Sequence, residues 1–161
     1  MPTLTTSLFY DRRALEAAEF YVSVFPDSRI RSVARTPADT PFTKAGDLLS
    51  VEFELMGKPF VAIQGGSEFP FTEAVSFQVH CDAQEEVDRY WDALLAGGGT
   101  ESRCGWLKDR FGLSWQVIPT GMTDYIGGPD PEGARRAMEA MLTMSKLDLD
   151  AMRRAYEGGE A

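Results

Sequence analysis

Amide and hydroxyl side chains with the spacing of a strand face carry the clearest chemical signal in this sequence. In residues 113–118 apolar and polar side chains alternate, which predicts a strand with Trp115 on a packed face and Gln116 on the opposite one. A glutamine can donate and accept hydrogen bonds, so the face that carries it is predicted to line a wet site. Gly112, in the turn at residues 109–112 before this strand, supplies the positive φ that a tight turn needs.

A second predicted strand, residues 75–81, carries the other polar set. Alternation places Ser76, Gln78 and His80 on one face. His80 is the one histidine of the chain, and the ordinary pKa of imidazole suits a general base. The simpler interpretation is a histidine at a strand end that bonds to backbone or water, because no partner for it is visible in the sequence. His80 is therefore kept only as a candidate catalytic residue.

Composition excludes several classes of function. The formal net charge is −9, from 25 acidic and 16 basic residues, which disfavours a nucleic-acid partner because such binding needs basic surface. One histidine and two cysteines are too few for a soft transition-metal site or a disulfide framework. A transition-metal site would therefore have to rely on carboxylates, and we expect no cofactor and no nucleic-acid partner.

Length and hydropathy predict an ordinary globular chain. Its 161 residues fit one domain, and 43% hydrophobic residues are enough for a core. There is no apolar run of membrane-spanning length, and the start, Met1 to Leu4, lacks the charged and apolar regions of a signal peptide. These features predict a cytoplasmic protein with no membrane partner.

The elements that must position the polar residues occur in a repeated order. Strand, helix and three strands are predicted at residues 4–10, 13–25, 29–35, 49–55 and 59–64, with a loop at 36–47. The same order recurs at 75–81, 83–96, 100–103, 104–108 and 113–118. Asp11 and Asp82 are predicted to cap the two helices. Glu52 and Glu54 alternate with the apolar positions of their strand. They either line the site or face solvent, and the second interpretation is favoured for two acids without a partner.

The tail differs from the repeat. Asp130 and Pro131 predict the start of a helix that runs to about residue 144, and Asp148 caps a last helix that ends near Tyr156. We expect one domain over residues 1–125, with modules at about 3–66 and 74–119, and a helical extension over 126–161. The methionine-rich apolar face of this extension packs on the domain or on a partner subunit.

Seven short motifs, taken in order, resemble one family. They are Phe20-Tyr21, Phe25-Pro26-Asp27-Ser28, the segment 51–55, Gly65-Gly66, the segment 76–81, the segment 104–109 and Trp115-Gln116-Val117. Together they resemble the PhnB-like branch of the vicinal oxygen chelate superfamily, which also contains glyoxalase I, bleomycin-resistance proteins and extradiol dioxygenases. The resemblance covers about residues 3–157.

This resemblance implies an α+β fold in which two βαβββ modules form curved mixed sheets around a cup, with a helical hairpin at the C-terminus. In metal-dependent relatives, four strand positions in the cup are typically His or Gln, Glu, His and Glu. The corresponding positions here are Ser7, Gln64, Ser76 and Gln116, so an amide replaces the last glutamate. Neutral amides and hydroxyls are weak ligands for a divalent cation. The cup is therefore expected to be free of metal.

The ligand-binding residues expected from this mapping and from strand parity are Ser7, Gln64, Ser76, Gln78, Trp106 and Gln116. Trp106 either stacks on a planar ligand at the mouth of the cup or fills the cup itself. The resemblance also implies a homodimer.

Three interpretations of function stay open: binding of a small polar metabolite, metal-independent lyase, isomerase or transferase chemistry, and sequestration of a drug or ligand. The branch is often labelled 3-demethylubiquinone-9 3-methyltransferase. A nucleotide-type methyltransferase would need a glycine-rich turn before a helix, whereas Gly97, Gly98 and Gly99 follow one.

Overall fold

The computed structural model describes residues 1–159 and divides into two compact units, Met1–Pro70 and the part that begins at Phe71. Each unit contains one of the predicted modules. Within the described residues no helix is both long and apolar enough to cross a bilayer. The two units are described separately below.

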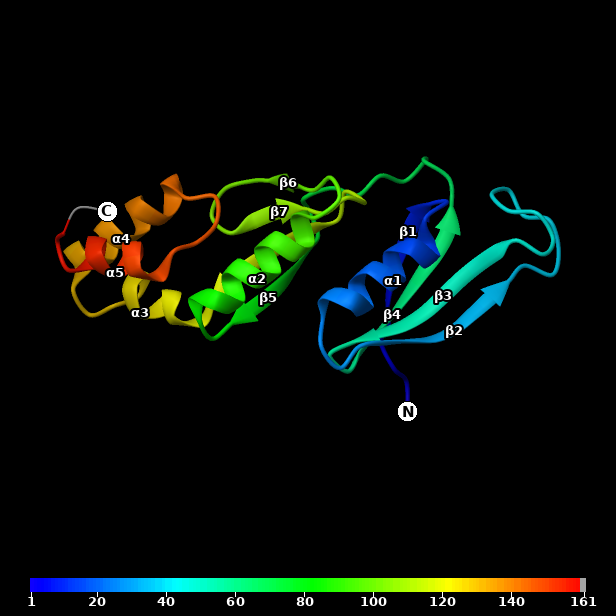
Figure 1. Ribbon diagram of the computed structural model, residues 1–161, viewed down its shortest axis with the longest axis horizontal. Helices are drawn as coiled ribbons and strands as arrows, with labels where there is room; N and C mark the ends of the chain where they lie inside the picture. Colours follow the sequence, from blue (N-terminus) through cyan, green and yellow to red (C-terminus); the bar gives the residue numbers. More distant parts are fainter. Residues whose placement is uncertain (160–161) are drawn as a thin grey trace. The chain divides into compact units, whose positions relative to one another are not determined.

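The first unit is a four-stranded mixed sheet with one helix. Its elements are β1 (Thr6–Asp11), α1 (Ala14–Val24), β2 (Arg29–Arg35), β3 (Leu48–Leu55) and β4 (Lys58–Gly65). The strand order is β1-β4-β3-β2, with β1 parallel to β4 and the other pairs antiparallel (Figure 1). The parallel pair forms because α1 carries the chain from β1 to β2 at the opposite edge of the sheet, and the antiparallel strands β3 and β4 then bring it back beside β1.

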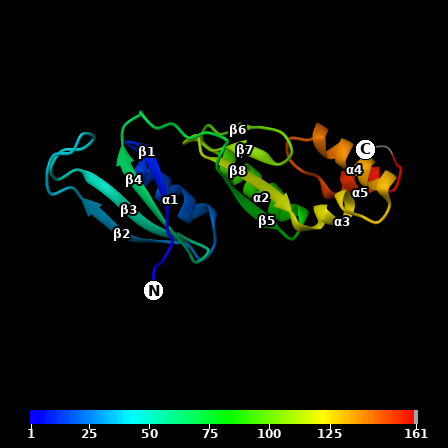
Figure 2. The ribbon, with the colours of Figure 1, turned by 180° about the vertical axis from the view of Figure 1, so that it is seen from behind.

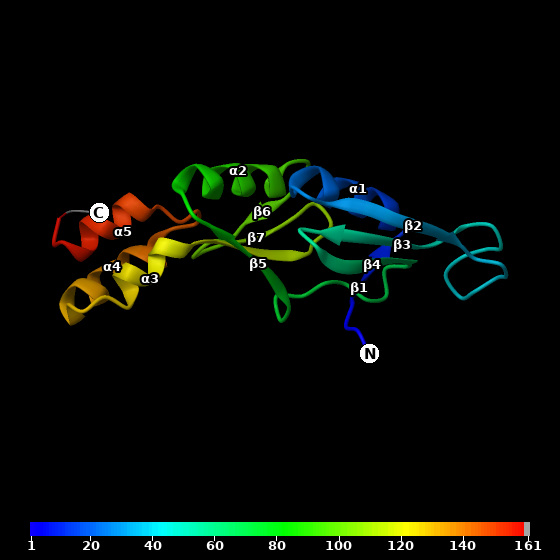
Figure 3. The ribbon, with the colours of Figure 1, turned by 90° about the horizontal axis from the view of Figure 1, so that it is seen from below.

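Period-two alternation determines which face of this sheet packs against α1. Val51 and Phe53 of β3 are buried, while Glu52 between them is exposed. Ala17 and Ala18 are fully buried on the helix, where small side chains let it approach the sheet closely. Burial of a side chain such as Phe53 contributes roughly 1.5–3 kcal/mol. Figure 3 shows α1 on one face of the sheet, and no helix of this unit on the other.

The second unit repeats this architecture. It contains β5 (Ser76–Cys81), α2 (Gln84–Leu95), β6 (Thr100–Glu101), β7 (Trp106–Lys108) and β8 (Ser114–Pro119). The strand order is β5-β8-β7-β6, with β5 parallel to β8 (Figure 2). Val79, Val117 and Trp115 are buried on the side of α2, as their parity predicts.

A helical region follows the second sheet. It consists of a 3₁₀ turn, η1 (Thr120–Met122), and the helices α3 (Thr123–Ile126), α4 (Pro131–Thr143) and α5 (Leu149–Tyr156). The side chain of Asp130 accepts a hydrogen bond from the N–H of Glu132, and Asp148 accepts one from Ala151, so both predicted caps are confirmed. The elements η1 and α3 were not predicted.

The helical region is anchored to the second sheet by a turn that the sequence predicted as strand. The N–H of Cys104 donates to the carbonyl of Met144 at 2.8 Å, and that of Gly105 to Ser145 at 2.8 Å. The strand predicted at residues 104–108 therefore begins only at Trp106. Gln84, at the start of α2, adds two hydrogen bonds to this segment. Its Nε2 donates to the carbonyl of Leu147, and its Oε1 accepts from the N–H of Leu149.

The two helices of the modules are capped by other residues than those predicted. Gln64 Oε1 accepts from the N–H of Ala14, so β4 rather than Asp11 satisfies the first turn of α1. At α2 the side chain of Glu86 accepts from the N–H of Asp82, while Asp82 makes no capping bond within the helix. Orphan N–H groups at a helix start donate to any nearby oxygen, which a distant residue supplies at α1 and a residue of the helix's own first turn supplies at α2.

Candidate functional site

Three predicted residues form a connected polar row on the second sheet. Ser76 and Gln78 of β5 lie beside β8 in parallel register, with Gln78 opposite Gln116. Gln116 Nε2 donates to Ser76 Oγ at 2.8 Å, and Gln78 Nε2 donates to Gln116 Oε1 at 3.2 Å. The row lies on the face away from α2, because its neighbours Val79 and Val117 are buried on the other face.

Trp106 continues this face onto β7. It lies opposite Gln116 in the antiparallel register of β7 and β8, and its ring lines a hollow of about 190 Å³. The hollow is lined by Glu73, Thr100, Glu101, Ser102, Trp106, Leu107, Lys108 and Ser114. Trp106 therefore forms one wall of this hollow, whose lining does not include Ser76, Gln78 or Gln116.

The hollow contains both a fixed charge pair and an unpaired hydroxyl. Lys108 Nζ lies 2.5 Å from Glu73 Oε1, and this ammonium holds the pKa of Glu73 below its usual range. Ser114 is 1% exposed, and its Oγ has no hydrogen-bond partner among residues 1–159. A buried hydroxyl without a partner costs about 1–3 kcal/mol unless water or a ligand satisfies it.

His80 lies on the same face of β5 as Gln78, two residues further along the strand. It pairs in register with Ile118 and is exposed, and its side chain makes no hydrogen bond to any described residue. A general base is normally oriented by a second group, as in the known triads. The structure supplies no such group for His80 from the described part of the chain.

The two remaining predicted residues, Ser7 and Gln64, belong to the first unit and line separate hollows. Ser7 is exposed on β1 and lines a hollow of about 280 Å³ together with Arg31, Glu52 and Glu54. Gln64 pairs with Tyr10, whose side chain is buried and hydrogen-bonded to Tyr21 of α1. The parity of Gln64 is thus that of the helix side, and its oxygen is used to cap α1.

The two glutamates of β3 are bound to neighbours rather than simply solvated. Glu54 forms ion pairs with Arg29 and Arg31, and Glu52 accepts a hydrogen bond from Ser32 at 2.9 Å. The hydrogen bond from Arg31 is the main reason that the pKa of Glu54 is lowered. The arginines come from β2, whose antiparallel register with β3 was needed to predict the pairing.

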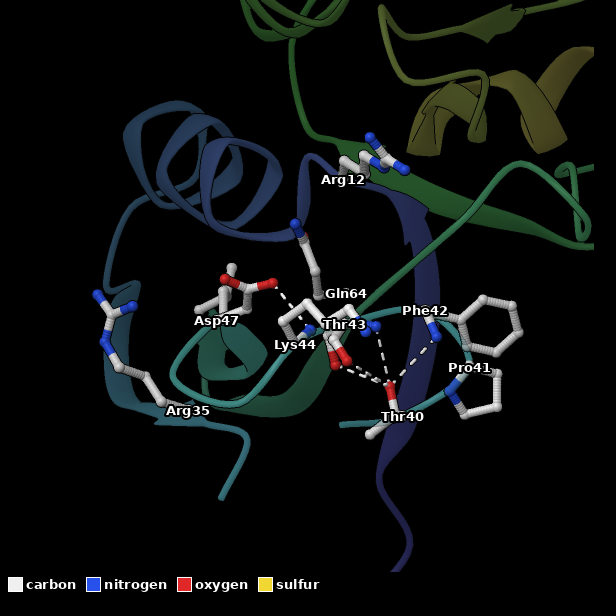
Figure 4. Close-up of a pocket in the computed structure, with 10 residues that line it drawn as sticks. Arg12, Arg35, Thr40, Pro41, Phe42, Thr43, Lys44, Asp47 and Gln64 are labelled. Atoms are coloured by element: carbon white, nitrogen blue, oxygen red, sulfur yellow. Dashed lines mark hydrogen bonds between the residues drawn. The ribbon is translucent and has the colours of Figure 1, made fainter. Parts of the chain in front are cut away.

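A larger hollow of about 500 Å³ lies at one end of the first sheet, lined by residues at the strand ends and by the loop at residues 36–47 (Figure 4). Three cationic side chains line it: Arg12 after β1, Arg35 at the end of β2, and Lys44 from the loop. Gln64 also lines it. The sequence did not indicate this group, because its three cations are far apart in the chain and only the fold brings them to one hollow.

The residues at the four mapped positions do not fit a divalent metal ion. Ser7, Gln64, Ser76 and Gln116 supply only neutral oxygens, whereas divalent cations in proteins are held by carboxylates, imidazoles or thiolates. Within residues 1–159 there is also no group of three or more His, Cys, Asp or Glu side chains placed to hold a metal. No catalytic step through a metal is therefore derived.

Comparison with known proteins matches residues 2–118 to the family described as 3-demethylubiquinone-9 3-methyltransferase. A Bacillus cereus structure, described as a candidate 3-demethylubiquinone-9 3-methyltransferase and PhnB protein, is 31% identical. The match covers 74% of this chain and 100% of that one, with a TM-score of 0.65.

Two more distant structures share the fold. Protein PA1353 from Pseudomonas aeruginosa is 17% identical over 74% of this chain and 98% of its own, with a TM-score of 0.59. The fosfomycin resistance protein FosX from Mesorhizobium loti is 14% identical over 73% and 90%, with a TM-score of 0.53. Among curated proteins no relative matches the chain.

Proposed function

This chain belongs to the PhnB-like family of the vicinal oxygen chelate superfamily, and on that premise we propose that its second unit binds a small polar molecule. The ligand lies against the row formed by Ser76, Gln78 and Gln116, with Trp106 as one wall. The observation that carries the proposal is the buried hydroxyl of Ser114, which has no partner among the described residues and lines the hollow beside this row.

The row has hydrogen-bonding capacity left for a ligand. Each glutamine amide offers two N–H donors and two acceptor lone pairs. Gln116 uses one donor on Ser76 and one lone pair on Gln78, so one of each is left. The row is neutral, which favours a ligand with several hydroxyl, amide or carbonyl groups over a strongly charged one. A planar part of such a ligand can stack on the Trp106 ring.

Binding without a metal is the primary proposal, and two alternatives share the same site. In one, the protein is a metal-independent lyase, isomerase or transferase, in which Gln78 and Gln116 orient the substrate and His80 moves a proton. In the other, it sequesters a drug or similar ligand. The second alternative takes its support from the fosfomycin resistance proteins that share the fold.

Methyl transfer is not proposed, although the family description names it. The strand-to-helix turns of the two modules, at residues 12–13 and 82–83, contain no glycine. They therefore lack the close backbone approach with which a nucleotide-type cofactor is held.

A ligand screen by thermal shift, followed by calorimetry on the hits, tests the binding proposal. Gln116→Leu and Ser114→Ala are compared with Ile118→Leu, a control on the same face of β8. Loss of one Gln116 hydrogen bond to the ligand is expected to weaken binding by up to about tenfold, from roughly 0.5–1.5 kcal/mol per bond. Hits that bind equally to Gln116→Leu and to the unchanged protein contradict the proposed site.

His80→Ala separates binding from catalysis once a ligand is known. If the ligand is converted, unchanged affinity with lost turnover supports proton transfer by His80. Unchanged turnover removes His80 from the mechanism and leaves the amide row as the binding site alone.

We also propose that the protein is a cytoplasmic homodimer. Met138 and Leu142 are 38% and 52% exposed on α4, four residues apart on one helix face, which supports a subunit contact there. Both cysteines, Cys81 and Cys104, are free, as a reducing compartment favours. Light scattering at micromolar concentration is expected to give the mass of a dimer, and a monomer contradicts this assembly.

A further inference from the structure

The hollow lined by Arg12, Arg35 and Lys44 has a charge opposite to that of the chain as a whole. It is lined by three cationic side chains and by one carboxylate, that of Asp47, so its lining carries two net positive charges (3 − 1). The chain as a whole carries a net charge of −9. A concentrated positive charge on an acidic protein attracts and selects anions. The volume of about 500 Å³ is within the range of small-molecule sites.

The two arginines of this hollow have no acidic partner among the described residues. Arg12 makes no side-chain hydrogen bond or ion pair with any described residue, and Arg35 donates to a backbone carbonyl, that of Gly46, at 3.1 Å. Lys44 pairs with Asp39, which is exposed. The carboxylate of Asp47 accepts a hydrogen bond from the backbone N–H of Lys44. The one carboxylate that lines the hollow thus binds the loop backbone and not an arginine side chain.

The loop that carries Lys44 is held in place before any ligand binds. The N–H of Thr36 donates to the backbone carbonyl of Asp47 at 2.9 Å, and the N–H of Gly46 donates to the carbonyl of Thr36 at 2.8 Å. These two bonds close the loop at its base. Phe42 packs edge-on against Phe9 of β1, with ring centroids 5.5 Å apart. A site whose walls are fixed in advance loses less entropy on binding.

The backbone at Arg12 gives no reason for an arginine there. Its φ is 57°, in the left-handed region where glycine and asparagine are the less costly choices. Its N–H donates to the carbonyls of Tyr10 and Gly65, contacts that any residue except proline could make. The long cationic side chain must therefore be explained by what it does at the hollow.

We propose that this hollow binds the oxyanion of a small organic acid, a carboxylate or phosphoryl group, with Arg12 as its principal donor and Arg35, on the opposite side of the hollow, as a second cation (Figure 4). Guanidinium groups match both head groups because they donate two parallel hydrogen bonds. Pro41, Phe42 and Leu48 line the same hollow and accommodate an apolar body. This site lies in the first unit and works through charge, so it goes beyond the neutral amide row proposed above.

Four benzene derivatives with different head groups test this assignment by calorimetry: benzoate, phenyl phosphate, benzyl alcohol and benzylamine. Arg12→Asn removes the charge while it keeps a residue suited to the left-handed backbone, and Arg35→Gln tests the second donor. Arg103→Gln, an exposed position of the second unit, loses the same charge elsewhere and is the control. Circular dichroism checks that the variants are folded.

The two anionic probes are expected to bind, and the tighter of them identifies the head group. Arg12→Asn weakens that binding about tenfold or more, because a hydrogen bond to a charged group is lost, and added salt weakens it further. Arg103→Gln leaves it unchanged. Benzyl alcohol or benzylamine binding as tightly as the anions, or anion affinity that is equal in Arg12→Asn, overturns the proposal. Neither outcome bears on the Gln116 site.

Discussion

Asp109 is predicted to be the residue on which the position of β8 most depends. Its side chain is 3% exposed in the turn between β7 and β8. Oδ1 accepts from the N–H groups of Phe111 and Leu113 at 2.8 and 3.1 Å, and Oδ2 accepts from Trp115 Nε1 at 2.9 Å. One carboxylate thus holds both the turn and Trp115, the buried tryptophan next to Gln116 in β8.

The cost of changing Asp109 follows from these three bonds. Asp109→Asn keeps the shape, but its NH₂ group must face at least one of the three donors. One bond of about 1.5–3 kcal/mol is lost, and a donor is left buried and unpaired. We expect Asp109→Asn to lower the free energy of unfolding by about 2–4 kcal/mol, and Asp109→Ala, which leaves all three donors without an acceptor, by about 3–5 kcal/mol.

Urea denaturation followed by tryptophan fluorescence measures this loss in the correct part of the molecule. The three tryptophans of the chain, Trp91, Trp106 and Trp115, all lie in the second unit. Asp124→Asn, at an exposed position of the same unit, is the matched control and is expected to change the free energy of unfolding by no more than about 0.5 kcal/mol. A loss below about 1 kcal/mol for both Asp109 variants refutes this account of the turn.

Three further outcomes are expected. Burial raises the pKa of Cys81 from 9.0 to about 11. The part of the folding free energy that depends on its neutral thiol is therefore complete below pH 9 and is lost as the pH rises towards 11. Cys81→Ala should remove this part of the pH dependence in urea titrations. Gly105→Ala should lower the free energy of unfolding by roughly 1–3 kcal/mol, because φ is +81° and a Cβ would lie 2.7 Å from the carbonyl oxygen of Val117; a neutral effect on the melting temperature contradicts this. Elemental analysis of purified protein should find zinc, nickel and iron well below one equivalent, and stoichiometric metal bound at Ser76 and Gln116 would overturn the metal-free site.

The fold was predictable wherever a local pattern decided the structure. Alternation placed Trp115 towards α2 and Gln116 away from it, and the order of strands and helices indicated two similar modules. The Asp130 and Asp148 caps followed from adjacent residues. These features depend on periodicity and on neighbours within a few positions, which the sequence states directly.

The remaining features depend on residues that are distant in the chain. Gln64 was expected as a ligand-binding residue; it has the parity of Tyr10, caps α1 fifty residues away and also lines the hollow of Arg12 and Arg35. Glu54 was expected to be solvated, yet register with β2 gives it two arginines. Cys104 was expected to begin a strand, but its backbone binds the segment after α4. Sequence alone does not state which distant donor meets which acceptor.

The amide row is the central claim for function, and side-chain NMR tests it most directly. In ¹⁵N-labelled protein, the side-chain NH₂ signals of Gln78 and Gln116 and the indole N–H of Trp106 report on this face. During titration with a hit from the thermal-shift screen, these three signals are expected to shift more than other side-chain amide and indole signals. Gln116→Leu should reduce the shifts at Gln78 and Trp106 at the same ligand concentration, because binding is about tenfold weaker. Saturable binding that leaves all three signals unmoved would contradict the assignment of the ligand site to this sheet.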